Sequence, residues 1–365
     1  MKYADIEGLA KKDPFKKGFA DLFAATSSNL IKNRIRILPQ SIGEPAALLD
    51  FLDYDFYLAF KTDGVGTKSL IADIMAGNLR KRKVRNVSIA GLYAGLGIDL
   101  IASNVNDLIC LGAIPIALSD EIAAGDYHKF IDKDFIKGLY KGLKSGCLSS
   151  GITIPCGESP TMTDVVGKNV ESITASAIGI LRPKKKAIFG QKLKAGDAIF
   201  ALLSSGIHTN GLSLARRIVE KLPQGYFTSF GQSTIGKELL IPTMIYVKPV
   251  LEMIAENIDI HYMSNISGSA FHKIARAKKE FTYIVDRLPK KPKVLEYLQK
   301  LGKIPDSEAY ETWNMGVGYA IFAPESEEKK LEKVCQKYRV GFMRIGEVKK
   351  GKKQVIIKPI DVVYA

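Results

Sequence analysis

The sequence predicts an α/β (α+β) fold with two domains. Strand-like and helix-like segments alternate along the 365 residues, which is typical of sheets covered by helices. A chain of this length can form two domains, each with its own hydrophobic core. The polar segment from Arg182 to Lys186 interrupts the alternation and has the composition of a linker. We therefore expect an N-terminal domain over residues 1–183 and a C-terminal domain over residues 184–365.

Strands are expected where short apolar, β-branched or aromatic runs end at glycine, proline or polar residues. These runs cover residues 56–60, 115–119, 152–155, 172–181, 198–203, 282–285, 317–322, 341–348 and 354–357. Helices are expected where apolar residues recur at helical spacing. These segments cover residues 13–25, 70–76, 92–111, 132–149, 211–221, 247–255, 270–278, 293–301 and 325–337.

The composition, 46% hydrophobic and 25% charged, is that of an ordinary globular protein. No apolar run reaches the length that spans a bilayer, and the first eight residues, MKYADIEG, lack the apolar core of a signal peptide. We therefore expect a cytoplasmic protein without a membrane partner. Cys110, Cys147, Cys156 and Cys335 match no zinc motif and are interpreted as reduced core thiols. The four histidines are scattered, which disfavours a transition-metal site.

The formal net charge of +15 and the pI near 9.4 make nucleic-acid binding a possibility to be weighed. Lysines and arginines cluster over residues 80–85, 184–186, 290–293 and 349–353. Because these clusters fall in expected loops and contain no interleaved aromatics, a solvated lysine-rich surface is the favoured interpretation. Such a positive field would also attract anionic, phosphorylated small molecules.

A glycine turn between a strand and a helix carries the clearest chemical signal. The sequence from Lys61 to Ser69 is KTDGVGTKS, directly after an aromatic strand-like run. Its two glycines permit positive φ, and the N–H groups at the start of the following helix favour an anion. Asp63 offers oxygen to Mg²⁺, and Lys68 offers positive charge to a phosphate. The turn predicts a nucleotide-phosphate site, although the motif alone also fits a purely structural turn.

Polar residues on one face of the helix expected over residues 92–111 form the second signal. Asp99, Ser103, Asn106 and Asp107 lie three, four or eight positions apart, so they share one side of that helix. Asp and Asn are poor residues for a helix interior, and their grouping suggests oxygen ligands for Mg²⁺. An ordinary solvated helix face is the alternative.

Two later loops place polar groups at the ends of expected elements. Gly157, Glu158 and Ser159 follow a strand, where ligand groups are common in folds of this class. The segment over residues 204–211, SSGIHTNG, opens a helix, and its hydroxyl, imidazole and amide groups suit a phosphate. His208 taken alone could instead be a neighbour of a helix cap.

These segments, in this order, resemble the phosphoribosylformylglycinamidine cyclo-ligase family, whose members are also called aminoimidazole ribonucleotide synthetases. The family motifs T-D-G-V-G-T-K, G-I-D-L, V-N-D and, loosely, G-E-T are matched at residues 62–68, 97–100, 105–107 and 157–159. The motifs S-S-G-x-H-S-N-G-x-S-L, L-L-x-P-T-x-I-Y-V-K and N-M-G-V-G are matched at residues 204–214, 239–248 and 314–318, with Thr209 in place of serine. The likeness covers nearly the whole chain.

The chain departs from the family pattern in several loops. Residues 41–45 replace a glycine-rich segment, residues 160–163 replace A-E-M-P, and residues 265–270 read NISGSA instead of H-I-T-G-G-G. Met244 stands where an arginine is common, and residues 78–93 look inserted. The motifs on the ATP side are better kept than those that would touch the second substrate, so the acceptor is less certain than the use of ATP.

The resemblance implies an aminoimidazole ribonucleotide synthetase-like fold of two α/β domains, in which the N-terminal sheets of two subunits pair in a homodimer. It implies an enzyme of de novo purine biosynthesis that uses ATP and Mg²⁺ to activate the formamide oxygen of formylglycinamidine ribonucleotide. A nitrogen of that small-molecule substrate then closes the imidazole ring. The alternatives are a superfamily enzyme with another, kinase-like acceptor, and, more remotely, a nucleotide- or RNA-binding protein.

The resemblance also implies roles for single residues. Metal binding falls to Asp63, Asp107 and Glu158. ATP binding falls to Asp63, Gly64, Gly66, Thr67, Lys68, Asp99, Asn106, Asp107, Gly157 and Glu158. Binding of the ribonucleotide substrate falls to Ser205, Gly206, His208, Thr209 and Asn210. The catalytic set is Asp63, Lys68 and Asp107, with His208 assisting proton transfer.

Overall fold

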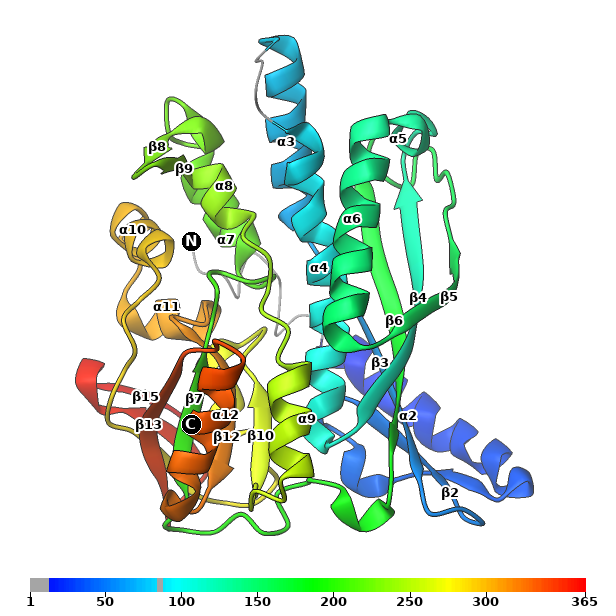
Figure 1. The fold of residues 1–365 in the computed structure, drawn as a ribbon, viewed down its shortest axis with the longest axis vertical. Helices are drawn as coiled ribbons and strands as arrows, with labels where there is room; N and C mark the ends of the chain where they lie inside the picture. The colour runs from blue at the N-terminus through cyan, green and yellow to red at the C-terminus, as the bar shows by residue number, and fades with distance from the viewer. Residues whose placement is uncertain (1–12, 84–87) are drawn as a thin grey trace.

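The computed structural model describes residues 13–83 and 88–365, which form two large sheets separated by helices (Figure 1). The N-terminal sheet has the strand order β1-β2-β3-β6-β4-β5. Its strands are β1 (Ile35–Ile37), β2 (Ala47–Phe51), β3 (Tyr57–Gly64), β4 (Ile114–Ala124), β5 (Thr153–Glu158) and β6 (Glu171–Leu181). Neighbouring strands are antiparallel except β4 and β5, which are parallel.

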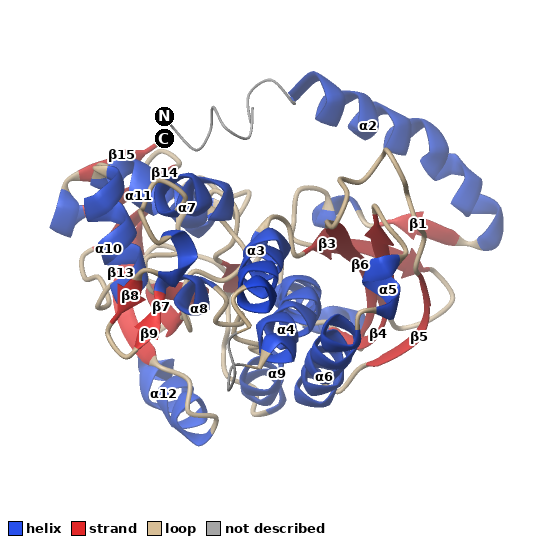
Figure 2. Cartoon of the chain, turned by 90° about the horizontal axis from the view of Figure 1, so that it is seen from above, coloured by secondary structure: helices blue, strands red, loops and turns tan. Residues whose placement is uncertain are grey.

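Helices of the N-terminal half lie between the two sheets (Figure 2). They are α3 (Lys68–Lys81), α4 (Ile89–Leu108) and α6 (Lys133–Ser150), while α5 (His128–Ile131) sits at the sheet end and α2 (Asp13–Thr26) extends outward. Helices α4 and α6 cross so closely that glycine is required. A Cβ on Gly142 would lie 1.9 Å from the carbonyl oxygen of Ala94, and one on Gly97 would lie 2.4 Å from the nitrogen of Leu143.

The other face of the N-terminal sheet is left open by the helices that the structure describes. Along β6, burial alternates residue by residue, because every second side chain points toward the helices. On the open face, Phe60, Ile114 and Ile116 keep 44%, 46% and 40% of their surface exposed. Exposed apolar side chains gathered on one sheet face are typical of an interaction surface.

The C-terminal sheet has the order β10-β12-β7-β13-β11-β14-β15. Its strands are β7 (Ala198–Leu203), β10 (Tyr262–Asn265), β11 (Thr282–Val285), β12 (Val317–Ala323), β13 (Phe342–Lys349), β14 (Gln354–Ile357) and β15 (Val362–Tyr364), and β8 (Ser229–Phe230) pairs separately with β9 (Ser233–Thr234). The helices are α7 (Leu212–Val219), α8 (Ile235–Leu239), α9 (Val247–Ala255), α10 (Lys293–Gly302), α11 (Asp306–Thr312) and α12 (Glu328–Lys337). The expected domain boundary after residue 183 falls in the connection between β6 and β7.

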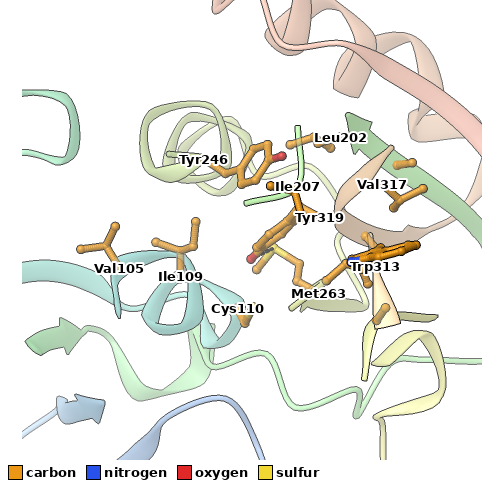
Figure 3. Close-up of a cluster of buried hydrophobic side chains, with 14 of the residues drawn as sticks. Val105, Ile109, Cys110, Leu202, Ile207, Tyr246, Met263, Trp313, Val317 and Tyr319 are labelled. Carbon is orange, nitrogen blue, oxygen red and sulfur yellow. Dashed lines mark hydrogen bonds between the residues drawn. The ribbon is translucent and has the colours of Figure 1, made fainter. Parts of the chain in front are cut away.

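The hydrophobic core is continuous between the two halves (Figure 3). Val105, near the end of α4, and Ile109, in the 3₁₀ helix Ile109–Leu111 that follows it, point toward Tyr246 and Tyr319 of the C-terminal half. The ring centroids of these two tyrosines are 5.4 Å apart. The stretch Ile89–Leu111 is long and apolar enough to cross a membrane, contrary to the sequence-based expectation, but 83% of its most apolar window is buried inside the fold. Its apolarity is therefore that of a helix packed on both sides.

Most expected elements are confirmed, several at the predicted residues. Strands β7, β11 and β14 and helix α9 have the predicted bounds. The segment expected as a helix over residues 270–278 is instead a 3₁₀ helix, Ala270–Ala275, which follows Ser269 at φ +63°. The short strand β10 was not predicted, because its residues Ser264 and Asn265 are polar although both are buried. Strands β1, β2 and β15 and helices α8 and α11 were also missed.

Candidate active site

The turn between β3 and α3 borders a cavity of about 420 Å³. Gly66, in the turn, has φ +62°, a conformation that favours glycine. Gly64 leaves no room for a side chain, because a Cβ there would lie 2.9 Å from the carbonyl oxygen of Ile173. Thr67 occupies the N-cap position of α3 at the cavity edge without a side-chain capping hydrogen bond, so the first N–H groups of the helix favour an anion. The turn therefore offers glycine backbone and a helix start to a ligand.

Three charged side chains meet where β3 faces α4. Lys61 and Asp63 are two positions apart on β3, so their side chains point to the same face of the sheet. The Nζ of Lys61 lies 2.8 Å from Oδ2 of Asp107 and 3.3 Å from Oδ2 of Asp63. Asp107 is buried, and its Oδ1 accepts a hydrogen bond from Nδ2 of Asn265 at 2.8 Å. Asp63 keeps 45% of its side chain exposed and is accessible to a ligand.

Lys68 does not reach the cavity. Its Nζ lies 2.8 Å from Oδ2 of Asp99 and donates a hydrogen bond to the carbonyl oxygen of Ile241 at 2.7 Å, and both charged side chains are fully buried. Oδ1 of Asp99 accepts hydrogen bonds from the N–H and the hydroxyl of Thr243 at 2.8 and 2.6 Å. Burial lowers the pKa of Lys68 and raises that of Asp99, against the attraction between the two charges. The structure thus gives Lys68 an ion pair where the sequence suggested a phosphate.

The polar face of α4 is buried between the two halves of the chain. Asn106 donates a hydrogen bond from Nδ2 to the carbonyl oxygen of Met244 at 2.8 Å and accepts one from the N–H of Tyr246 at 2.9 Å. Together with Asp99 it holds the backbone of residues 241–246. The solvated alternative for this helix face does not apply, and the amide and carboxylate oxygens of these two residues already have protein partners.

A second cavity, of about 50 Å³, lies between the two halves of the chain. It is lined by Asp63, Gly64, Ala102, Ser103, Asn106, His208, Thr209, Asn210, Thr243, Asn265, Ile266 and Ser267. The structure therefore brings the β3–α3 turn, the polar face of α4 and the loop over residues 204–211 to one place, although they are far apart in the sequence.

The loop over residues 204–211 is anchored to the C-terminal half by side chains. The hydroxyl of Ser205 donates to the carbonyl oxygen of Pro242 at 2.6 Å. Nδ2 of Asn314 donates to the carbonyl oxygen of Gly206 at 2.8 Å. These contacts leave Ser205 and Gly206 shaping the loop rather than facing the cavity.

His208 sits inside this loop at φ +62° and is buried. Its Nε2 accepts a hydrogen bond from the N–H of Ser205 at 3.3 Å. Burial, with a smaller effect from the charge of Lys68, lowers the pKa of His208 to about 3. The imidazole is therefore neutral near pH 7, and it is a poor proton donor. Thr209 and Asn210, the next two residues, are half-buried and line the cavity.

Glu158 lies away from the other expected metal ligands. It is exposed on β5, the edge strand, where Gly157 pairs with Asp120 and Glu158 pairs with Glu121. Following the register across β4 and β6 places Glu158 on the open face of the sheet, three strands and about 14 Å from β3. Over residues 13–83 and 88–365, no three His, Cys, Asp or Glu side chains gather as a metal site. Asp63, Asp107 and Glu158 are thus not brought together within one chain.

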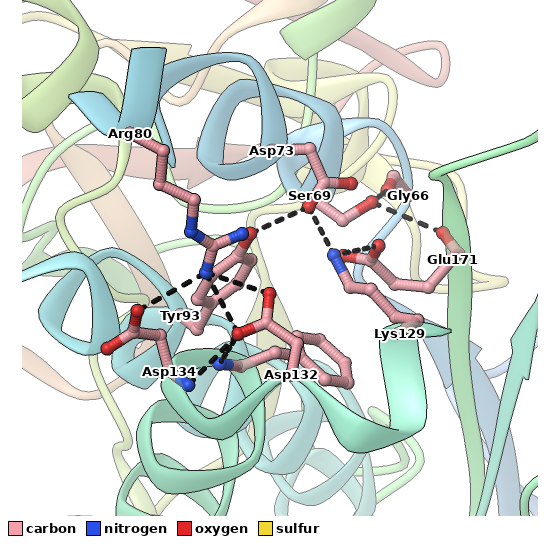
Figure 4. Close-up of polar contacts among 10 residues, drawn as sticks. Gly66, Ser69, Asp73, Arg80, Tyr93, Lys129, Asp132, Asp134 and Glu171 are labelled. Carbon is pink, nitrogen blue, oxygen red and sulfur yellow. Dashed lines mark hydrogen bonds and ion pairs between the residues drawn. The ribbon is translucent and has the colours of Figure 1, made fainter. Parts of the chain in front are cut away.

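Two carboxylates share one lysine near the larger cavity (Figure 4), and one of them, the buried Glu171, lines that cavity. Lys129 forms ion pairs with Asp73 of α3 and, at 2.7 Å, with Oε2 of Glu171 at the start of β6. The hydroxyl of Tyr93 donates to Asp73 at 3.0 Å. Because one ammonium faces two carboxylates, burial and the charge of Asp73 raise the pKa of Glu171 to about 8. Glu171 therefore holds a proton at neutral pH.

Residues 43–181 match the model of the AIR synthase related protein, N-terminal domain, and residues 194–358 match that of its C-terminal domain. The chain belongs to this family. Phosphoribosylformylglycinamidine cyclo-ligase of Methanocaldococcus jannaschii is 38% identical over 329 residues, which are 89% of this chain and 87% of that protein. The protein of the same name from Pyrococcus horikoshii is 35% identical over 321 residues, 88% of this chain and 87% of that protein. The predicted resemblance to the cyclo-ligase family is thereby confirmed, and with it the prediction of an enzyme, a ligase of purine biosynthesis.

Solved structures with the AIR synthase-like fold superpose on most of this chain. A thiamine-monophosphate kinase from Stenotrophomonas maltophilia has a TM-score of 0.58 at 18% identity, over 89% of this chain and 92% of that chain. The hydrogenase maturation protein HypE, in complex with ATP, has a TM-score of 0.58 at 17% identity, over 84% of this chain and 83% of that chain. These similarities confirm the predicted fold class.

Family motifs alone did not reveal several residues of this site. Lys61 precedes the T-D-G-V-G-T-K motif of the AIR synthase family, and period-two alternation on β3 would have placed it beside Asp63. Asn265 stands where the family motif H-I-T-G-G-G begins, and it is the partner of Asp107. Thr243 was recognised only as part of a motif, and its contact with Asp99 gave no signal in the sequence.

Proposed function

We propose that this protein closes the imidazole ring of formylglycinamidine ribonucleotide with ATP, forming aminoimidazole ribonucleotide, ADP and phosphate. The γ-phosphoryl group of ATP is transferred to the formamide oxygen, a substrate nitrogen then attacks the activated carbon, and phosphate leaves with that oxygen. The observation that carries this proposal is the meeting of the β3–α3 turn and the loop over residues 204–211 at one cavity, in a chain 38% identical to a cyclo-ligase.

The larger cavity suits the phosphates of ATP. Its volume of about 420 Å³ lies in the range of small-molecule sites, and Gly64, Gly66 and Thr67 line it. HypE, which shares the fold, has been solved with ATP, which supports the same ligand here. Phosphoryl transfer asks mainly for positioning and charge neutralisation, so no protein nucleophile is required.

Asp63 fits a Mg²⁺ ion that accompanies ATP. Its carboxylate is half exposed at the cavities, and carboxylate oxygen is a preferred ligand of this hard cation. When bound, Mg²⁺ neutralises charge on the phosphates. Asp107 is engaged by Lys61 and Asn265, and Glu158 lies on the other sheet face, so we assign the metal-binding role to Asp63.

The ribonucleotide would contact polar groups of the second cavity, which lies between the two halves of the chain. Thr209 and Asn210 provide a hydroxyl and an amide there, and Ser267 lines the same space. His208 keeps the loop in shape through Ser205, and because it is neutral we assign it a positioning role.

We propose further that two copies of this chain pair through the open face of the N-terminal sheet. Phe60, Ile114 and Ile116 are exposed on that face, and covering them would remove apolar surface from water. The sheet face opposite the helices is the obvious place for a second sheet, as in aligned sheet packing.

The test is an assay of purified protein with ATP, Mg²⁺ and formylglycinamidine ribonucleotide. The expected result is one aminoimidazole ribonucleotide for each ADP released. ADP release with thiamine monophosphate, but none with formylglycinamidine ribonucleotide, would overturn the proposal in favour of a kinase-like acceptor. Salt-sensitive RNA binding without ATP turnover would favour the nucleic-acid alternative.

A further inference from the structure

Lys61 occupies the space between two carboxylates that could otherwise share a metal ion. Its Nζ is 2.8 Å from Asp107 and 3.3 Å from Asp63. The fold fixes this position, because Lys61 and Asp63 share one face of β3, and that face is packed against α4, which carries Asp107. On the neighbouring strand β6, Ala177 pairs with Lys61 and Ala175 pairs with Asp63, and these small side chains leave the space free for the lysine.

An ammonium and a divalent cation cannot occupy this place together. Mg²⁺ binds carboxylate oxygen at about 2.0–2.1 Å with octahedral geometry, whereas the ammonium sits at hydrogen-bond distance and donates its protons to both carboxylates. The side chain of Lys61 is only 18% exposed, so it has little room to swing aside. Asp107 is further held through its second oxygen by Asn265.

The ammonium of Lys61 lies within ion-pair distance of both carboxylates, and its side chain is largely buried between them. A second lysine lies in the same region. Lys273, from the 3₁₀ helix after β10, donates to the hydroxyl of Ser267 at 2.6 Å, and Ser267 lines the cavity that Asp63 also lines.

We propose that the ammonium of Lys61 takes the place of a divalent cation between Asp63 and Asp107. The proposal rests on the ATP-dependent function proposed above, and it means that the nucleotide's Mg²⁺ is held by Asp63 without help from Asp107. Lys61 then offsets one of the two negative charges of the carboxylate pair beside the proposed phosphate site.

The test measures metal binding directly, in the absence of nucleotide. Mn²⁺ is titrated into the full-length protein, and free Mn²⁺ is followed by electron paramagnetic resonance. Lys61→Met keeps a long unbranched side chain but removes the charge. This variant is expected to bind Mn²⁺ at least about tenfold more tightly than the unaltered protein. Adding Asp107→Asn to that variant is expected to abolish the gain. Lys329→Met, on the exposed surface of α12, serves as the matched control and is expected to change nothing.

Equal Mn²⁺ affinity in the unaltered protein and in Lys61→Met would overturn the proposal. So would a loss of Mn²⁺ binding when Asp107→Asn is made in the unaltered background. That second comparison remains decisive if Lys61→Met fails to fold. Because no nucleotide is present, these results do not depend on ring closure, and a failure of the proposed function would appear only in the activity assay.

Discussion

Lys68 and Asp99 form a fully buried ion pair, with 2.8 Å between Nζ and Oδ2, where α3 and α4 meet residues 241–246. The lysine belongs to the glycine turn and the aspartate to the polar face of α4, two segments that the sequence suggested for ATP. Their charges instead fix the C-terminal half against the N-terminal helices. The part of the turn that lines the cavity and that we propose for the phosphates is its glycine backbone, with Asp63 and Lys61 beside it.

Replacing Lys68 is expected to affect stability first. Lys68→Met leaves Asp99 buried without its partner, so we expect a loss of about 3–5 kcal/mol in the free energy of unfolding, measured with urea. The double variant Lys68→Met/Asp99→Leu is expected to recover a large part of that loss, because the lone charge is gone. An unchanged stability together with weakened ATP binding would contradict the structural role.

Asp63 is expected to act on the nucleotide and hardly on folding. Because it is half exposed, Asp63→Asn should change the free energy of unfolding by less than about 0.5 kcal/mol. Turnover with ATP and Mg²⁺ is expected to fall about 10²-fold or more, as when other groups that stabilise developing charge are removed. Glu256→Gln, an exposed carboxylate at the end of α9, is the control. Full activity of Asp63→Asn would remove the basis for its metal-binding role.

The lowered pKa of His208 predicts that the protein loses stability in weak acid. Its pKa is about 3 in the fold and near 6.5 in the unfolded chain, so between these values only the unfolded chain binds the proton. Stability should therefore fall as the pH drops below 6.5, by about 1.4 kcal/mol per pH unit from this group. His208→Asn, which tolerates positive φ, is expected to lose that contribution to the slope between pH 6.5 and 5, and His272→Asn is expected to keep it. Identical slopes in both variants would count against a buried neutral imidazole.

The raised pKa of Glu171 predicts that stability changes with pH in the opposite direction at higher pH. Its pKa is raised from an ordinary 4.5 to about 8, so the fold retains a proton that the unfolded chain releases. Stability should fall as the pH rises from 4.5 to 8, again by about 1.4 kcal/mol per unit. The effect is best read between pH 7 and 8, where His208 no longer contributes. Glu171→Gln should flatten that part of the curve in urea titrations, and Glu256→Gln should leave it unchanged.

Pairing through the open sheet face predicts a change in molecular mass. Ile114→Lys places charge within the exposed apolar face, and we expect monomers by light scattering after size-exclusion chromatography at micromolar concentration. Leu148→Lys, at a still more exposed apolar residue on α6, should leave the dimer intact. Monomers in the unaltered protein, or dimers in both variants, would show that this face does not pair.

Much of the architecture could be read from local pattern. Apolar runs gave β7, β11 and β14 at their observed residues, because these strands are buried and bounded by polar or glycine residues. Strand β10 could not be found in this way, since Ser264 and Asn265 are buried polar residues whose partners come from other segments. Edge strands such as β1 and β15 are too short to show an alternation.

The candidate site shows the same division. Asp63, Thr209 and Asn210, which the motifs marked as candidate binding residues, line the cavity between the two halves of the chain. The environment of Lys68 depends on Ile241, 173 positions away, and no local spacing reveals that contact. Glu158 could not be placed either, because the face of the sheet that it occupies follows from the pairing of β5 with β4.

The position of α4 has a practical consequence for anyone who would divide this protein. Val105 and Ile109 belong to the same buried hydrophobic cluster as Tyr246 and Tyr319. A fragment that ends at residue 183 lacks both tyrosines, so it would expose these apolar side chains to solvent. Such a fragment is expected to aggregate and to fold poorly, even though it ends in the connection between the two sheets. The two sheets can be separated at this point of the sequence, but the hydrophobic core that the two halves share cannot.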